Sequence, residues 1–223
     1  MNNGYNPISG AKLLAMGASE FVQHNPLPAV PIELQAITSL WSGQRFLNSD
    51  FTAENLMLQR RLQPYQMIHL ATHSQFNPGN PDNSYIQLWD QAQLRLSELP
   101  MLRWSQPIVE LLVLSSCNTA LGNQEAELGF AGLAAHSGVR SVVATLWSVS
   151  DEGTLALMTS FYQQLQTAIT KSDALREAQI ALLRGEVSLA NNELVTLDHQ
   201  MPPSLNLTHP YYWSGFTMIG NPW

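Results

Sequence analysis

The chain has 223 residues, of which 45% are hydrophobic and only 12% are charged, and its formal net charge is −7. This composition excludes a disordered chain, and the scarcity of lysine and arginine excludes a basic surface for nucleic acids. The single cysteine rules out an internal disulfide. Without a signal-like N-terminus or an apolar stretch of ~20 residues, we expect a cytoplasmic protein that does not contact a membrane.

The N-terminal third of the chain predicts two strands and two helices. We expect a strand over residues 12–17 and, after a proline-rich loop, a helix from about 32 to 41. A short extended segment, 45–47, then precedes a helix over 53–62. Thr52 stands directly before that second helix, where a threonine hydroxyl can cap the first turn.

Two apolar runs in the middle of the chain each end on a reactive side chain. Residues 67–73 end on His73, and residues 108–117 end on Cys117, the only cysteine. Such runs are typical of buried strands in a parallel sheet, and ligands bind beyond the carboxyl ends of these strands. As neighbours, the two strands would bring His73 and Cys117 to one rim, where an imidazole can accept a thiol proton.

The other predicted elements alternate between strands and helices. They are a polar loop over 74–83, a strand over 85–88, a turn at 97–99, a helix over 129–136, a strand over 141–146, helices over 151–167 and 172–183, an irregular segment over 185–209 and a strand over 216–219. This alternation predicts an α/β fold with a central, mainly parallel sheet flanked by helices on both faces.

Each reactive residue also has a structural interpretation. A lone cysteine is usually a small buried hydrophobe, and a histidine at a strand end is often a satisfied core residue. Cys117, however, lies where its apolar run turns polar, and a thiol beside a histidine can be held partly as thiolate. We interpret His69, inside its run, as buried and structural. A metal site with His73 lacks a third ligand at a suitable spacing, so no metal is expected.

Five blocks of the sequence together form a recognisable pattern. They are His-Leu-Ala-Thr-His-Ser at 69–74, Leu-Ser-Ser-Cys-Asn-Thr-Ala at 114–120, Glu-Leu-Gly-Phe-Ala-Gly-Leu-Ala-Ala at 127–135, Val-Val-Ala-Thr-Leu-Trp-Ser-Val-Ser-Asp at 142–151 and His-Pro-Tyr-Tyr-Trp-Ser-Gly-Phe-Thr-Met-Ile-Gly at 209–220. In this order they resemble the blocks of the CHAT peptidase family, which belongs with separase, gingipain and clostripain to the caspase-like (clan CD) cysteine proteases. The resemblance implies a caspase-like sandwich forming one domain overall, with residues 1–27 as leader and first strand and 28–223 as the peptidase domain.

The resemblance also implies roles for individual residues. His73 corresponds to the general base, and Cys117 to the nucleophile that forms a thioester acyl-enzyme, which water then hydrolyses. The backbone N–H groups of Cys117 and Ser74 correspond to the oxyanion hole. Ser74 departs from the family, which often has glycine there, and its side chain can crowd the hole. The implied partners are a protein substrate and a regulatory protein or a fused TPR or other sensor domain, with no cofactor.

Three more residues are candidates for substrate binding. Asp151 either complements the dipole at the start of a long helix or lies near the pocket for the residue before the scissile bond, where it would favour arginine or lysine. Trp147 either packs at the sheet edge or walls a substrate pocket. Glu127 either faces the cleft or only water.

Two other functions stay open beside a cysteine endopeptidase. The first is a protein-interaction module that has kept the caspase-like fold and lost activity; the intact His73 and Cys117 pair disfavours it, and Ser74 slightly favours it. The second is a nucleotide-binding protein. Its best candidate loop, residues 16–21, lacks the glycine spacing that lets the backbone approach a pyrophosphate.

Overall fold

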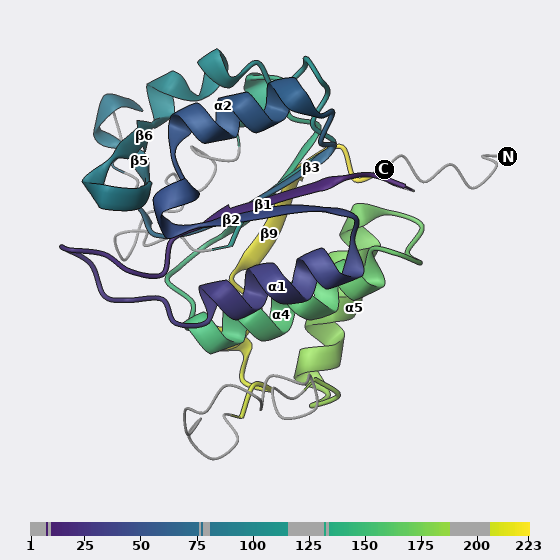
Figure 1. Ribbon diagram of the computed structural model, residues 1–223. Coiled ribbons are helices and arrows are strands. Elements are labelled where there is room, and N and C mark those ends of the chain that lie inside the picture. Colours follow the sequence, from purple (N-terminus) through teal and green to yellow (C-terminus); the bar gives the residue numbers. More distant parts are fainter. Residues whose placement is uncertain are drawn as a thin grey trace, which may run out of the picture.

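A six-stranded sheet runs through the centre of the molecule (Figure 1). The computed structural model describes residues 8, 10–75, 77, 81–115, 132, 134–187 and 206–223. The strands, in spatial order, are β2 (Gly43–Leu47), β1 (Leu13–Gly17), β3 (Met67–Ala71), β7 (Leu111–Leu114), β8 (Ser141–Thr145) and β9 (Phe216–Gly220). All neighbours pair in parallel except β9, which runs antiparallel to β8. The predicted mainly parallel sheet is therefore confirmed.

Side chains alternate between the two faces of this sheet, and both faces are buried. On β1 and β3, Leu14 and Ile68 belong to the apolar cluster on one face, whereas Leu13 and Met67 belong to the cluster on the other. Strands that are buried on both faces read as continuous apolar runs in sequence, which is why they could be recognised there.

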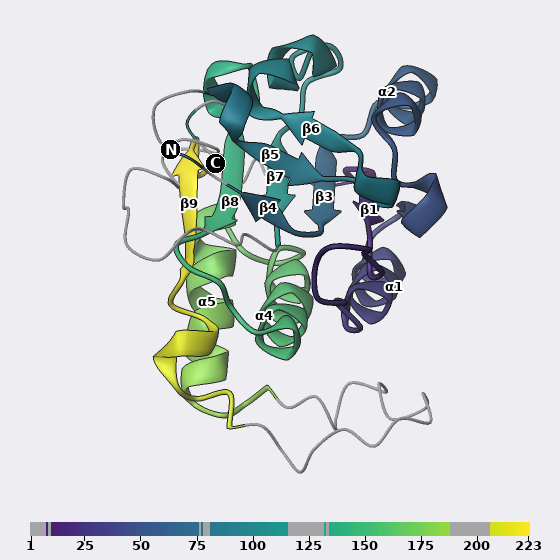
Figure 2. The same cartoon turned by 90° about the vertical axis from the view of Figure 1, so that its left-hand side faces the viewer.

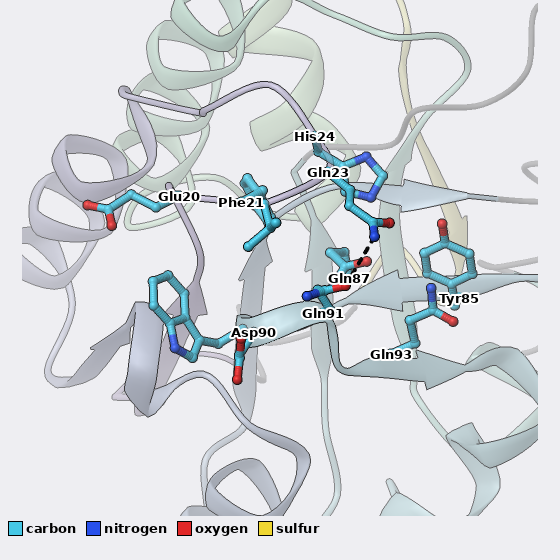
Figure 3. Close-up of a pocket in the computed structure, with 11 residues that line it drawn as sticks. Glu20, Phe21, Gln23, His24, Tyr85, Gln87, Asp90, Gln91 and Gln93 are labelled. Carbon is cyan, nitrogen blue, oxygen red and sulfur yellow. Dashed lines mark hydrogen bonds between the residues drawn. The ribbon is translucent and has the colours of Figure 1, made fainter.

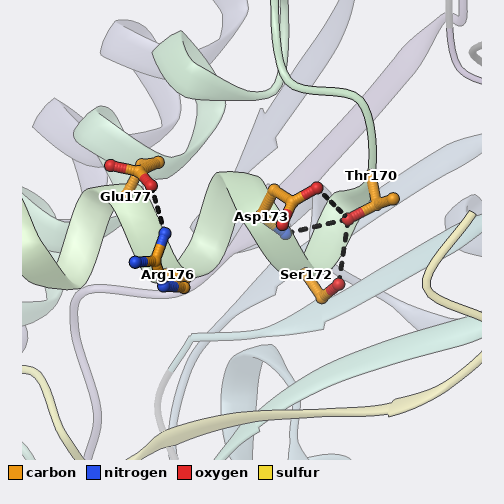
Figure 4. A network of polar contacts seen from close by, with 5 residues as sticks. All are labelled: Thr170, Ser172, Asp173, Arg176 and Glu177. Atoms are coloured by element: carbon orange, nitrogen blue, oxygen red, sulfur yellow. Dashed lines mark hydrogen bonds and ion pairs between the residues drawn. The ribbon is translucent and has the colours of Figure 1, made fainter.

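Three helices cover one face: α1 (Val30–Leu40), α4 (Asp151–Gln164) and α5 (Lys171–Leu183) (Figure 1). The Thr170 hydroxyl caps α5 by accepting a hydrogen bond from the Asp173 N–H at 3.0 Å, and Arg176 pairs with Glu177 on the exposed side of the same helix (Figure 4). In the part of the chain that the structure describes, no helix is both long and apolar enough to cross a bilayer.

The opposite face carries α2 (Ala53–Leu62) and a small antiparallel sheet of β4 (Ser74–Gln75), β5 (Tyr85–Gln87) and β6 (Gln93–Arg95) (Figure 2). Short 3₁₀ helices complete this side. They are η1 (Asn48–Asp50), η2 (Pro81–Asn83), η3 (Trp89–Gln91) and η4 (Leu96–Leu102), with η7 (Pro210–Tyr212) before β9. Of these three strands only β5 was predicted, because its Tyr-Ile pair favours a strand, whereas β4 (Ser-Gln) and β6 (Gln-Leu-Arg) contain no aromatic or β-branched residue.

Most predicted bounds agree with the structure to within three residues. The helix over 53–62 has the expected bounds, and the Thr52 hydroxyl accepts a hydrogen bond from the Asn55 N–H. β7 begins three residues later than expected, because Ile108 lies in an isolated bridge with Ser105 and is 41% exposed. Half of the predicted helix over 129–136 and most of the irregular segment over 185–209 lie outside the described residues.

Candidate active site

His73 lies at the rim of the sheet, two residues beyond the end of β3. The neighbouring parallel strand is β7, with Leu70 opposite Leu114, and the Ser115 N–H continues the ladder by donating to the Leu70 carbonyl at 3.1 Å. The predicted adjacency of the two strands is therefore confirmed. Cys117, which the sequence places two residues after Ser115, lies outside the described residues.

The loop between β1 and α1, residues 18–29, surrounds the His73 ring. The ring centroids of Phe21 and His24 lie 4.7 and 5.1 Å from that of His73. His73 Nε2 lies 2.8 Å from the Asn25 carbonyl oxygen. Because a carbonyl only accepts, this contact assigns the proton of the neutral ring to Nε2 and leaves Nδ1 as the acceptor.

Burial is the main cause that lowers the pKa of the His73 imidazole. The Asn25 carbonyl opposes this shift, and the charge of His24 adds to it, so that the net direction is downward. The ring is therefore neutral at neutral pH, the form in which a histidine can accept a proton. The role of Asn25 could not be predicted, since a main-chain carbonyl has no side-chain signature.

Ser74 begins β4 and is buried. It stands opposite Ile86 of β5, while the His73 carbonyl accepts a hydrogen bond from the Gln87 N–H at 2.9 Å. In an antiparallel ladder this makes Ser74 and Ile86 a pair that does not exchange its own hydrogen bonds. The Ser74 N–H is consequently directed away from β5.

Asp151 connects the starts of two helices. It is the first residue of α4, and its Oδ2 accepts a 2.6 Å hydrogen bond from the N–H of Ala29, the residue before α1. Burial raises the pKa of Asp151 to about 7; the Ala29 hydrogen bond opposes the rise, and the charges of Glu33 and Glu152 add to it. Of the two interpretations of Asp151, these contacts support the one at the helix end.

Trp147 packs at the edge formed by β8 and β9. Its Nε1–H donates to the Tyr211 carbonyl at 3.1 Å, and a Cβ placed on Gly215 would lie 2.9 Å from its ring. This contact supports packing at the sheet edge. Glu127 lies outside the described residues.

His69 is buried in the core, as the sequence analysis expected. Its Nε2 lies 2.9 Å from Glu33 Oε1, although the approach lacks the direction of a hydrogen bond, and its Nδ1 lies 3.2 Å from the Tyr162 hydroxyl. Burial raises the pKa of Tyr162 well above its ordinary value, so the hydroxyl stays protonated. Glu33 could have been found from its spacing, because it lies four residues before Ile37 on the buried face of α1.

A pocket of about 530 Å³ lies between the 18–29 loop and the β5–β6 hairpin (Figure 3). Phe21 and His24 line it on the side of the loop and are the residues whose rings contact His73. On the other side, Gln91 accepts a 3.1 Å hydrogen bond from Gln23 across the pocket. This pocket was not predicted, because it forms where two segments distant in sequence, the 18–29 loop and the β5–β6 hairpin, come together.

Comparisons with known proteins agree with this architecture. The family model described as "CHAT domain" matches residues 4–221. No match was found among curated proteins. The structure of the Arg-specific cysteine proteinase gingipain R is similar at 9% identity, with a TM-score of 0.56 over 98% of this chain and 48% of that one. A complex of the pro- and mature domains of Porphyromonas gingivalis RgpB is similar at 11% identity, with a TM-score of 0.56 over 98% of this chain and 49% of that one.

These similarities establish the fold and not the chemistry, because the identities are so low. The sheet order, the parallel strands and the helices on both faces are those of a caspase-like cysteine peptidase fold. The chain spans about half the length of the solved proteins that it matches.

Proposed function

This chain belongs to the CHAT domain family, and on that basis we propose that it is a cysteine endopeptidase in which His73 activates the thiol of Cys117. The proposed substrate is a protein, since peptidases with the caspase-like fold cleave peptide bonds. We also propose that a partner protein or a fused sensor domain regulates the activity.

The register of β3 and β7 is the observation that carries this proposal. Met67 stands opposite Leu111 and Leu70 opposite Leu114, so the two strands are offset by 44 residues (111 − 67). His73 and Cys117 are separated by the same 44 residues (117 − 73). Continued two residues beyond Ser115, this register would bring the cysteine level with the histidine on neighbouring strands, which meet at one rim.

The environment of His73 suits a general base. In the proposed reaction, Nδ1 accepts the proton of the Cys117 thiol, and the thiolate attacks the peptide carbonyl. The protonated ring then donates that proton to the leaving amine, and water hydrolyses the remaining thioester. Throughout, the Asn25 carbonyl fixes the orientation of the ring through Nε2–H and stabilises the imidazolium.

We further propose that the Ser74 N–H, with that of Cys117, stabilises the oxyanion. The direction of the Ser74 N–H, away from β5, is consistent with this role. The serine side chain is the departure from the family that favours the alternative function, a caspase-like module that binds protein without cleaving it. Loss of one oxyanion donor typically lowers kcat by 10²–10³-fold, about 2.7–4 kcal/mol. A measurement of kcat therefore distinguishes an active peptidase from a module that only binds protein.

Cleavage of a diverse peptide library, followed by mass spectrometry, tests the proposal. We expect cuts with the wild-type chain and none with Cys117→Ala. His73→Ala should slow alkylation of the Cys117 thiol by iodoacetamide near pH 7, because the base is removed. Equal cleavage by Cys117→Ala, or an unchanged alkylation rate in His73→Ala, would exclude the dyad. A Ser74→Gly variant that gains activity would show that the serine side chain crowds the hole.

A further inference from the structure

The pocket beside His73 is acidic and aromatic. Its lining residues include the exposed acidic residues Glu20 and Asp90 and the aromatic residues Phe21, Tyr85 and Trp89. Glu20 lies at the rim, with its carboxylate directed away from Phe21 and His24 (Figure 3). Among these lining residues, all of them in the described part of the chain, there is no lysine or arginine, and His24 is the one group that can carry a positive charge. Carboxylates beside aromatic faces are suited to a cationic side chain.

A rigid amide forms part of the pocket wall. Gln87 is 4% exposed, and its Nε2 donates two hydrogen bonds of 3.0 Å, to the carbonyls of Leu88 and Ala92. Both amide hydrogens are therefore engaged, which fixes the side chain and leaves its oxygen as the group that can accept from a ligand. The Gln87 backbone N–H also donates to the His73 carbonyl, so this wall is bonded directly to the candidate base.

The tip of the β5–β6 hairpin is a tight turn at the pocket. Asp90 and Gln91 have φ angles of 52° and 63°, and the Ala92 N–H donates to the Trp89 carbonyl at 3.1 Å, which are the features of a primed hairpin turn. The hydrogen bond from Gln23 holds Gln91 to the opposite wall. The turn thus places Asp90 among the lining residues.

The topology decides on which side of the scissile bond this pocket lies. β7, which leads to Cys117, is one neighbour of β3, and β1 is the other. The pocket is lined by residues 20–24, which follow β1, so it lies on the side of His73 away from the strand of the nucleophile. Because the histidine protonates the leaving amine, the leaving half of the substrate must pass on the histidine side.

We infer that this pocket is a specificity subsite for a lysine or arginine side chain of the substrate, on the leaving-group side of the scissile bond. Glu20 and Asp90 supply the countercharge, and the aromatic rings pack against the aliphatic stem and the cationic head. This inference rests on the proposed peptidase function, and it names a residue that the enzyme would select.

Matched peptides test the inference. Two peptides of otherwise identical sequence are compared by kcat/KM. One has lysine at the two positions after the cleaved bond, and the other has norleucine there. We expect the wild-type chain to prefer lysine by about tenfold or more, and the preference to fall to near unity in Glu20→Gln/Asp90→Asn. The control is Glu177→Gln, an exposed carboxylate on α5, which should keep the full preference. Equal rates for both peptides, or a preference that survives the double substitution, would overturn the inference.

A binding measurement separates this inference from the peptidase proposal. Fluorescently labelled lysine and norleucine peptides are titrated into the Cys117→Ala chain at low and high salt, and anisotropy is recorded. This titration needs no cleavage, so it tests the pocket even if the isolated chain cleaves no peptide. Tighter, salt-sensitive binding of the lysine peptide that Glu20→Gln/Asp90→Asn removes would support the pocket; equal binding would refute it.

Discussion

The Asp151 carboxyl group provides a quantitative test of the structure, and Asp151→Asn is the substitution that isolates it. The asparagine keeps an amide oxygen in the place of Oδ2, so the hydrogen bond from the Ala29 N–H can persist. What the substitution removes is the ionisation of a group that lies between two helix starts and near Glu33. Any change in the pH dependence of stability can then be assigned to the charge.

The sign follows from the direction of the pKa shift. Burial raises the pKa of Asp151 from 3.8 to about 7 in the folded protein, so between these values the folded state binds more protons than the unfolded state. This contribution to stability is complete below about pH 4 and is lost as the pH rises through about 7. A shift of about 3 units corresponds to ~4 kcal/mol for a fully desolvated group, and because the side chain keeps partial contact with water we expect about half of that.

Urea unfolding of both chains at intervals from pH 4 to pH 8 measures the effect. We expect the two free energies of unfolding to be similar at pH 4 and Asp151→Asn to be more stable by about 2 kcal/mol at pH 8. Glu177→Gln, an exposed carboxyl on α5, serves as the control. A difference between wild type and Asp151→Asn that stays constant across the range would refute the reasoning from burial.

Two further substitutions test other buried and half-buried groups. His69→Ala leaves the buried Tyr162 hydroxyl without its hydrogen-bond partner, so we expect the free energy of unfolding to fall by about 1–3 kcal/mol in urea titrations. A His69→Ala chain of normal stability but without activity would contradict the structural role. His24→Gln removes a charge that lowers the pKa of His73, so this pKa should rise. NMR titration of the ring protons measures it, and an unchanged value would show that His24 does not act on His73.

The parts of the fold that could be predicted are those with local signals. Thr52 and the helix after it are an example, because a capping side chain and helical periodicity both lie within a few residues of each other. The neighbouring strands β3 and β7 could be predicted because a strand buried on both faces is continuously apolar, and the side chain at which polarity resumes marks the rim. This is also why His73 could be named as a candidate base.

The features that could not be predicted depend on groups distant in sequence or without a side-chain signature. The Asn25 carbonyl reaches His73 across 48 residues and acts through the main chain. Asp151 and Ala29 are 122 residues apart. The position of Asp151 at the start of α4 could be predicted, but its hydrogen bond to the residue before α1 could not. The pocket likewise depends on the meeting of the 18–29 loop and the β5–β6 hairpin, two segments that are distant in sequence.

The loop between β1 and α1 carries a consequence for how this protein could be controlled. Asn25, whose carbonyl accepts from the candidate base, and Ala29, whose N–H donates to Asp151, lie four positions apart (29 − 25) just before α1. Because this segment is short, a bound partner that shifts α1 would also shift Asn25. The imidazole of His73 would then change its orientation although the partner does not contact it. Protonation of Asp151 near neutral pH would act on the same segment from its other end. The rate at which His73 activates the thiol would then depend on the position of residues 25–29. Inserting one glycine between Asn25 and Ala29 should make the orientation of His73 independent of movements of α1 and Asp151.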